Sequence, residues 1–144
     1  MYEFRLQSVL KYRENLEKKH IQEMSALQYS LAKEEAALRE TVRQVREISE
    51  HFEQEGERGV ASRNISVYNT LLKSANARIA EQEMRVNHAL MLVERKRLEL
   101  IKTSQGKKIL EKLKIKEKKR FFYNLARKNQ KETDDIAAKK YRTR

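Results

Sequence analysis

The sequence predicts an all-α fold, a long two-helix antiparallel coiled-coil hairpin with a basic C-terminal overhang. Two rows of residues, almost all apolar, step through the chain by seven, which is the signature of a coiled coil. The first row is Leu10, Glu17, Met24, Leu31, Leu38, Val45 and Phe52, and the second is Ile65, Leu72, Ile79, Val86, Val93 and Leu100. When the rows are paired from Phe52 and Ile65 outward, the two numbers in each pair always add up to 117. This symmetry about a glycine-containing segment predicts that the second helix folds back along the first.

The elements follow from the same pattern, within a single domain spanning 1–144. We expect a first helix over about 4–55, a turn over 56–63 in which Gly56 and Gly59 supply positive φ angles, and a second helix over about 64–130. Ser62 or Asn64 offers an N-cap for the second helix. The poor helix formers around Gly106 make 103–106 its weakest segment. Residues 131–144 have few apolar anchors, so we expect this basic tail to fray.

The composition suits a thin seam rather than a compact core. Apolar residues make up 39% of the chain and charged residues 38%, and there is no proline to break a long helix. The row beside the first one is mixed, because it includes Arg13, His20 and Glu34. We therefore expect a monomer of modest stability. No cysteine, membrane-length apolar run or secretory signal is present, which favours a soluble intracellular protein.

The net charge of +12 is concentrated in the last third of the chain. Residues 95–144 hold 19 Lys or Arg and 6 Asp or Glu, whereas 1–94 hold 14 and 15. Such a basic segment favours an acidic protein, a nucleic acid or an anionic membrane as partner, although a long solvated helix also carries lysines for solubility alone.

The sequence shows no arrangement of residues that is typical of a catalytic site. His20, His51 and His88 lie far apart in the predicted hairpin, and no phosphate-binding loop or nucleophile elbow is present. We therefore expect no catalytic residues, no metal site and no cofactor, and we interpret the protein as a non-enzyme.

Three segments remain as candidate binding surfaces. The first is the hairpin tip, whose apolar members are Phe52, Val60, Ile65, Tyr68, Leu71 and Leu72. Leu71 cannot share the face of Leu72, so it is either a contact residue or a scattered surface leucine. The second is the amphipathic basic run 107–120, and the third is the aromatic triplet 121–123. The triplet either anchors a partner or packs on the N-terminal residues Tyr2, Phe4 and Leu6.

Three motifs resemble the flagellar export protein FliJ family. They are Phe4-x-Leu6-x-x-Val9-Leu10-x-x-Arg13 at the start, Gly56-x-x-Gly59-Val60-Ala61-Ser62 followed by Tyr68 at the turn, and Gln130-Lys131-Glu132-x-x-Asp135-x-Ala137 with Tyr141 and Arg142 at the end. Their order and spacing, together with the length and charge of the chain, extend the resemblance over the whole sequence.

The resemblance implies a stalk-like adaptor of the flagellar type III export apparatus, peripherally associated with the inner-membrane export gate on the cytoplasmic side at the flagellar base. Its implied partners are the hexameric export ATPase FliI, the cytoplasmic domain of the export gate protein FlhA, and export chaperones. The stalk analogy implies that the ATPase binds the open end, namely Phe4, Arg5, Arg13, Lys116, Lys118, Lys119, Arg120, Phe121 and Phe122. The gate would then meet the tip, for which we name Phe52, Val60, Tyr68, Leu71 and Leu72. The alternative is a basic coiled-coil protein that binds nucleic acid or an anionic membrane surface. Of these two partners, nucleic acid is the one we do not expect.

Overall fold

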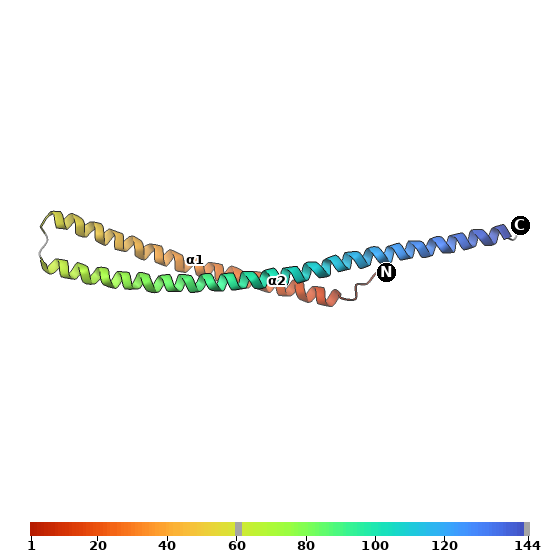
Figure 1. The fold of residues 1–144 in the computed structure, drawn as a ribbon, viewed down its shortest axis with the longest axis horizontal. Helices are drawn as coiled ribbons and strands as arrows, with labels where there is room; N and C mark the ends of the chain where they lie inside the picture. Colours follow the sequence, from red (N-terminus) through yellow and green to blue (C-terminus); the bar gives the residue numbers. More distant parts are fainter. Residues whose placement is uncertain (60–61, 143–144) are drawn as a thin grey trace. The chain divides into compact units, whose positions relative to one another are not determined.

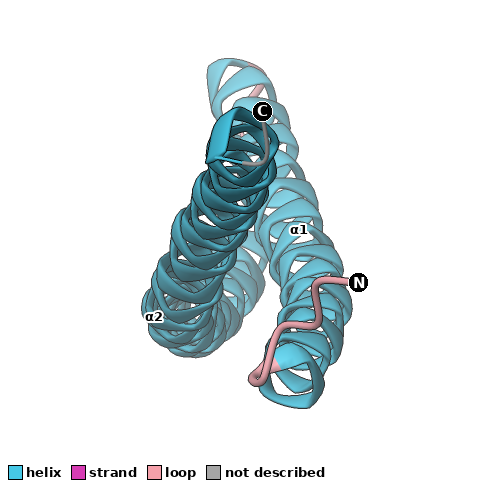
Figure 2. Cartoon of the chain, turned by 90° about the vertical axis from the view of Figure 1, so that its right-hand side faces the viewer, coloured by secondary structure: helices cyan, strands magenta, loops and turns pink. Residues whose placement is uncertain are grey.

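The computed structural model describes residues 1–59 and 62–142, except for the side chains at 62 and 63. Two helices, α1 (Gln7–Glu57) and α2 (Ser62–Arg142), pack against each other, which confirms the predicted helical hairpin (Figure 1). Helix and loop account for all the described residues, with no strand among them (Figure 2). The chain divides into two compact units, one formed by 1–19 with 100–144 and the other by 20–99, and each is described by itself.

In the unit of 20–99, α1 and α2 run antiparallel and bury a narrow seam. The row residues Met24, Leu31 and Leu38 of α1 and Leu72, Ile79 and Val86 of α2 are all partly buried. Thr41, a member of the mixed row, is 6% exposed and Ala89 of α2 is 8% exposed, so both are buried here. The Thr41 hydroxyl donates to the Ala37 carbonyl at 3.1 Å, which satisfies its polar group inside the helix. The seam is therefore built from one apolar row and one partly polar row, as the sequence predicts.

α1 ends at the glycines. Gly59 has a φ of +83°, and its backbone N–H donates to the Gly56 carbonyl at 3.3 Å. The Arg58 N–H donates to the Glu55 carbonyl at 3.0 Å, so the last carbonyls of the helix are satisfied by the turn. Gly59 is thus the residue with positive φ, whereas Gly56 lies inside α1. α2 begins at Ser62, so Asn64 lies within its first turn and is not the N-cap.

In the other unit, α1 begins later than expected. Residues 1–4 are not helical, and the first helical residue is Gln7, whose N–H donates to the Phe4 carbonyl at 3.0 Å. Phe4, which is 6% exposed, and Leu10, which is 3% exposed, form the buried core here. The expected start at residue 4 is corrected because burial of Phe4 places it in the core ahead of the helix rather than in the first turn.

α2 continues past both points where the sequence suggested an interruption. It is unbroken through 103–106, where Thr103 is 6% exposed and packs in the seam. It also continues to Arg142, which corrects the expected end near 130. Seven of the twelve residues at 131–142 are Ala, Lys, Arg or Glu, which all favour helix, and the Lys128 ammonium lies 4.0 Å from the Glu132 carboxylate one turn later.

Candidate functional site

The hairpin tip carries an open groove of about 670 Å³ between α1 and α2. It is lined by Gln44, Glu47, Ile48, His51 and Glu55 of α1 and by Asn64, Val67, Tyr68 and Leu71 of α2. Val67 is 63% exposed and Leu71 is 46% exposed, so the apolar part of the groove faces solvent. Such an arrangement offers a partner an apolar contact surrounded by hydrogen-bond acceptors.

One end of the groove is fixed by an aromatic pair. The rings of Phe52 and Tyr68 lie 4.6 Å apart between centroids and are tilted by 53°. The Tyr68 hydroxyl donates to the Glu55 carboxylate at 3.4 Å, and the His51 Nε2 lies 3.2 Å from the same carboxylate. Desolvation by its neighbours, followed by the negative charge of Glu55, raises the pKa of Tyr68. Tyr68 therefore serves as a positioned, neutral donor at the groove wall.

The structure brings most of the predicted tip residues to this region and adds others. Tyr68 and Leu71 line the groove, Phe52 supports Tyr68, and Leu72 is a half-buried seam residue. Val60 lies outside the described residues. The sequence analysis missed Val67, although its spacing of four residues from Leu71 already places the two on one helix face.

The expected open-end residues divide into buried, packed and exposed groups. Phe4 is a core residue. Arg5 lies with Glu117, Arg120 and Phe121 around a second open groove of about 520 Å³, which Met1, Tyr2, Glu3 and Asn124 complete. Lys116, Lys118, Lys119 and Arg120 are exposed.

The aromatic triplet is divided between a packed ring and two more exposed rings. The ring of Phe121 lies 5.6 Å from that of Tyr2, whose hydroxyl donates to the Lys114 carbonyl at 3.3 Å. Phe121 is thus held by the N-terminal segment, while Phe122, at 50%, and Tyr123, at 67%, are more exposed. Packing on the N-terminus is therefore confirmed for Phe121, and partner binding by the triplet stays a prediction.

Polar side chains also contact each other between α1 and α2 in the unit of 1–19 and 100–144. The Lys107 ammonium lies 2.5 Å from the Glu17 carboxylate, which also accepts a hydrogen bond from the Ser104 hydroxyl at 3.0 Å. The hydrogen bond from Lys107 lowers the pKa of Glu17, and the same bond raises the pKa of Lys107. Seven residues further on, about two turns, Lys114 donates to Gln7 at 2.8 Å.

Arg13 occupies a space that only a glycine leaves open. A Cβ atom placed on Gly106 would come 2.9 Å from Arg13 Nη1 and 3.4 Å from its Cζ, so the guanidinium packs directly on the α2 backbone. Arg13 is partly buried in this position. It is therefore less available to a partner than Lys116 or Lys118, although the resemblance places all three at the open end.

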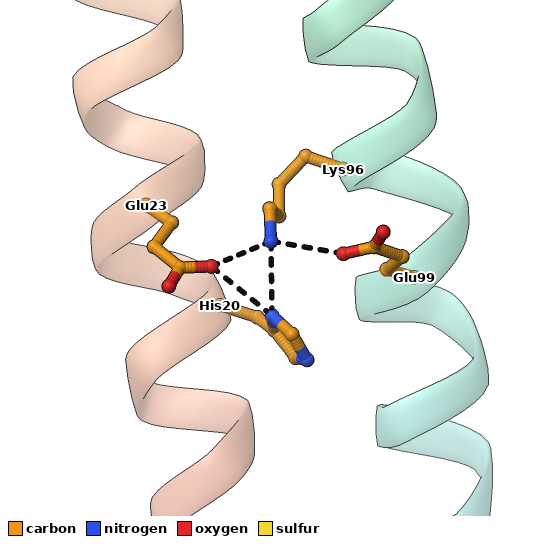
Figure 3. Close-up of polar contacts among 4 residues, drawn as sticks. All are labelled: His20, Glu23, Lys96 and Glu99. Carbon is orange, nitrogen blue, oxygen red and sulfur yellow. Dashed lines mark hydrogen bonds and ion pairs between the residues drawn. The ribbon is translucent and has the colours of Figure 1, made fainter.

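A second polar cluster lies in the unit of 20–99 (Figure 3). The Lys96 ammonium of α2 donates to Glu23 at 2.5 Å and to Glu99 at 2.9 Å, and it lies 3.3 Å from His20 Nδ1. The same Nδ1 lies 3.4 Å from the Glu23 carboxylate, so this ring nitrogen contacts both the ammonium and a carboxylate. The bonds to Glu23 and Glu99 raise the pKa of Lys96, and the bond from Lys96 lowers the pKa of Glu99. This cluster ties α1 to α2.

Two classes of site find no support in the described part of the chain. No group of three or more His, Asp or Glu side chains is arranged to hold a metal ion within 1–59 and 62–142. Across the same residues, neither helix contains a stretch apolar enough to cross a bilayer.

The comparisons with known proteins assign the chain to a family. The family model described as "Flagellar FliJ protein" matches residues 2–144. No curated protein and no solved structure matches the chain. Since the family match covers essentially the whole sequence, the chain belongs to the flagellar FliJ family and is a protein of flagellar export.

Proposed function

We propose that the chain is a stalk-like adaptor of the flagellar type III export apparatus. In this proposal its basic end binds the ring of the hexameric ATPase FliI, and its tip binds the cytoplasmic domain of the gate protein FlhA. It works on the cytoplasmic side of the inner membrane, at the gate, and helps to deliver export chaperones and their substrates. Family membership supports the setting, and the chemical difference between the two surfaces supports the division of roles.

The observation that carries the proposal is the charge of the last part of α2. Residues 118–142 are exposed throughout and hold nine Lys or Arg against three Asp or Glu. Basic side chains on all sides of one helix suit the inside of a protein ring better than a flat surface. Their attraction to acidic pore residues would act over a Debye length of about 8–10 Å and would weaken with salt.

The tip groove supports a different kind of contact. Its exposed apolar residues, Val67 and Leu71, are uncharged, and so they contribute little to long-range attraction. Apolar contacts chiefly slow the dissociation of a complex once it has formed. We therefore assign the tip to a longer-lived contact with the gate.

The ATPase contact is tested by charge reversal. The triple variant Lys118→Glu, Lys119→Glu, Arg120→Glu should abolish the effect of the chain on FliI hexamer formation and ATP turnover. The control Lys33→Glu, Lys73→Glu, Arg95→Glu makes the same change of charge at exposed positions elsewhere and should behave like the native chain. Absence of any effect of the native chain on FliI, with salt-dependent binding to duplex DNA or anionic vesicles, would overturn the proposal in favour of the alternative.

The gate contact is tested separately. Leu71→Glu places a charge in the groove and should weaken binding to the FlhA cytoplasmic domain at least tenfold in a titration calorimeter. Leu90 is 45% exposed, close to the 46% of Leu71, but does not line the groove, so Leu90→Glu is the matched control. Equal affinities for the two variants would remove the groove from the gate contact.

A further inference from the structure

The tip groove is apolar inside and negative around its edge. Ile48, Val67 and Leu71 contribute its apolar lining, and the carboxylates of Glu47 and Glu55 lie at its wall. The segment 44–58 around it holds five Glu and two Arg. This is a local excess of negative charge in a chain whose net charge is +12.

The end of α1 adds to this negative potential. The C-terminus of a helix carries a partial negative charge, which basic side chains in the last turn usually offset. The last turn of α1 has no basic side chain and instead contains Glu55 and Glu57. The groove therefore favours an occupant that combines apolar side chains with cations.

The last part of α2 has these properties. Phe122 is 50% exposed and Leu125 is 42% exposed, and their spacing of three residues places them on one helix face. Lys118 precedes Phe122 by four residues and Lys128 follows Leu125 by three, so a cation lies at each end of the apolar pair. All four side chains are exposed in the structure.

We infer that the chain associates with itself head to tail, with the Phe122–Leu125 face of one copy in the tip groove of a second copy. Phe122 and Leu125 would cover Val67 and Leu71, while Lys118 and Lys128 approach Glu47 and Glu55. The two surfaces in this contact differ, so each copy keeps one free groove and one free basic helix. Such a heterologous contact adds copies to an open chain rather than closing a dimer.

This association needs neither the ATPase nor the gate, so it stands independently of the proposed function. It does use the groove and the exposed Phe122, which the proposed function assigns to partners. Self-association and export contacts would therefore exclude each other. The expected monomer would be the form at low protein concentration or high salt.

The first test is the mass of the full chain in solution. Sedimentation velocity at about 50 mM salt should show an average mass that rises steadily with protein concentration, and about 500 mM salt should reduce it because screening shortens the reach of the charges. A monomer at every concentration in low salt would overturn the inference. A single dimer species that grows no further would also overturn it.

The second test uses complementary variants. Leu71→Glu disables the groove and Phe122→Glu disables the basic helix, so each variant alone should remain a monomer. An equimolar mixture should form a heterodimer, because the first variant keeps a native basic helix and the second keeps a native groove. Leu90→Glu should associate like the native chain, and circular dichroism checks that every variant keeps its helix content. Association of Leu71→Glu by itself, or a mixture that stays monomeric, would contradict the head-to-tail contact.

Discussion

The Lys107 ammonium lies 2.5 Å from the Glu17 carboxylate, at the position where the apolar row of α2 would continue beyond Leu100. Lys107 is seven residues after Leu100, and Lys114, seven further on, donates to Gln7. Within the unit of 1–19 and 100–144, two lysines at this spacing therefore contact polar side chains of α1.

Removing one or both partners of this pair should have opposite effects. Glu17→Leu leaves the Lys107 ammonium in the seam without its closest carboxylate, so we expect a lower free energy of unfolding. The double variant Glu17→Leu, Lys107→Leu extends the apolar row and should recover that loss or exceed the native stability. Urea unfolding of the native chain, both single variants and the double variant gives the coupling by a double-mutant cycle. The exposed Arg85–Glu81 pair is the control cycle, and a coupling there as large as in the seam would contradict the special role of Glu17.

The same pair predicts a pH dependence. The pKa of Glu17 is lower in the folded chain than in the unfolded chain, so its stabilising contribution is present above the unfolded pKa and is lost as pH falls through the folded pKa. The pKa of Lys107 is raised, so its contribution is lost only when pH rises through the folded value. The urea midpoint of the native chain should therefore fall toward that of Glu17→Gln as the pH drops below about 4, the ordinary range for a glutamate. If the difference in urea midpoint between the native chain and Glu17→Gln stayed constant over this pH range, the prediction would be contradicted.

The sequence predicted the parts of the fold that depend on repeated apolar spacing. The rows from Leu10 to Phe52 and from Ile65 to Leu100 predict the pairing of α1 with α2, and the glycines predict the turn. It did not predict the polar continuation through Lys107 and Lys114, because a lysine in a heptad row looks like a solvated surface residue until its partner is known. Glu17, the one polar residue in the first row, was the available signal.

The candidate sites were less predictable, because exposure is decided by details of packing. Phe4 and Phe122 are both aromatic residues near the open end, yet Phe4 is buried and Phe122 is half exposed. The start of α1 at Gln7 lets residues 1–4 leave the helix, so that Tyr2 reaches Phe121. Periodicity alone cannot give the path of a short non-helical segment.

The two glycines of the turn should respond to alanine in opposite directions. Gly56 lies inside α1, and an added Cβ would meet nothing within 4 Å, so Gly56→Ala should raise the free energy of unfolding by about 0.5–1 kcal/mol. Gly59 has a φ of +83°, where an L side chain is strained, so Gly59→Ala should lower it by about 1–2 kcal/mol. Thermal or urea unfolding followed by circular dichroism measures both. Effects of the same sign would contradict the assignment of Gly59 as the residue that ends α1.

A buried amide in the seam predicts a stabilising substitution. Among the described residues, the Gln82 Oε1 is a buried oxygen without a hydrogen-bond partner. An unsatisfied acceptor of this kind costs about 1–3 kcal/mol, and an apolar side chain of similar size removes that cost. Gln82→Leu should therefore raise the free energy of unfolding by about 1 kcal/mol, measured by urea unfolding. Gln22, which is exposed on α1, provides the control: Gln22→Leu should change stability by less than about 0.5 kcal/mol. If Gln82→Leu destabilises the chain, the amide has a partner in solution and contributes to stability.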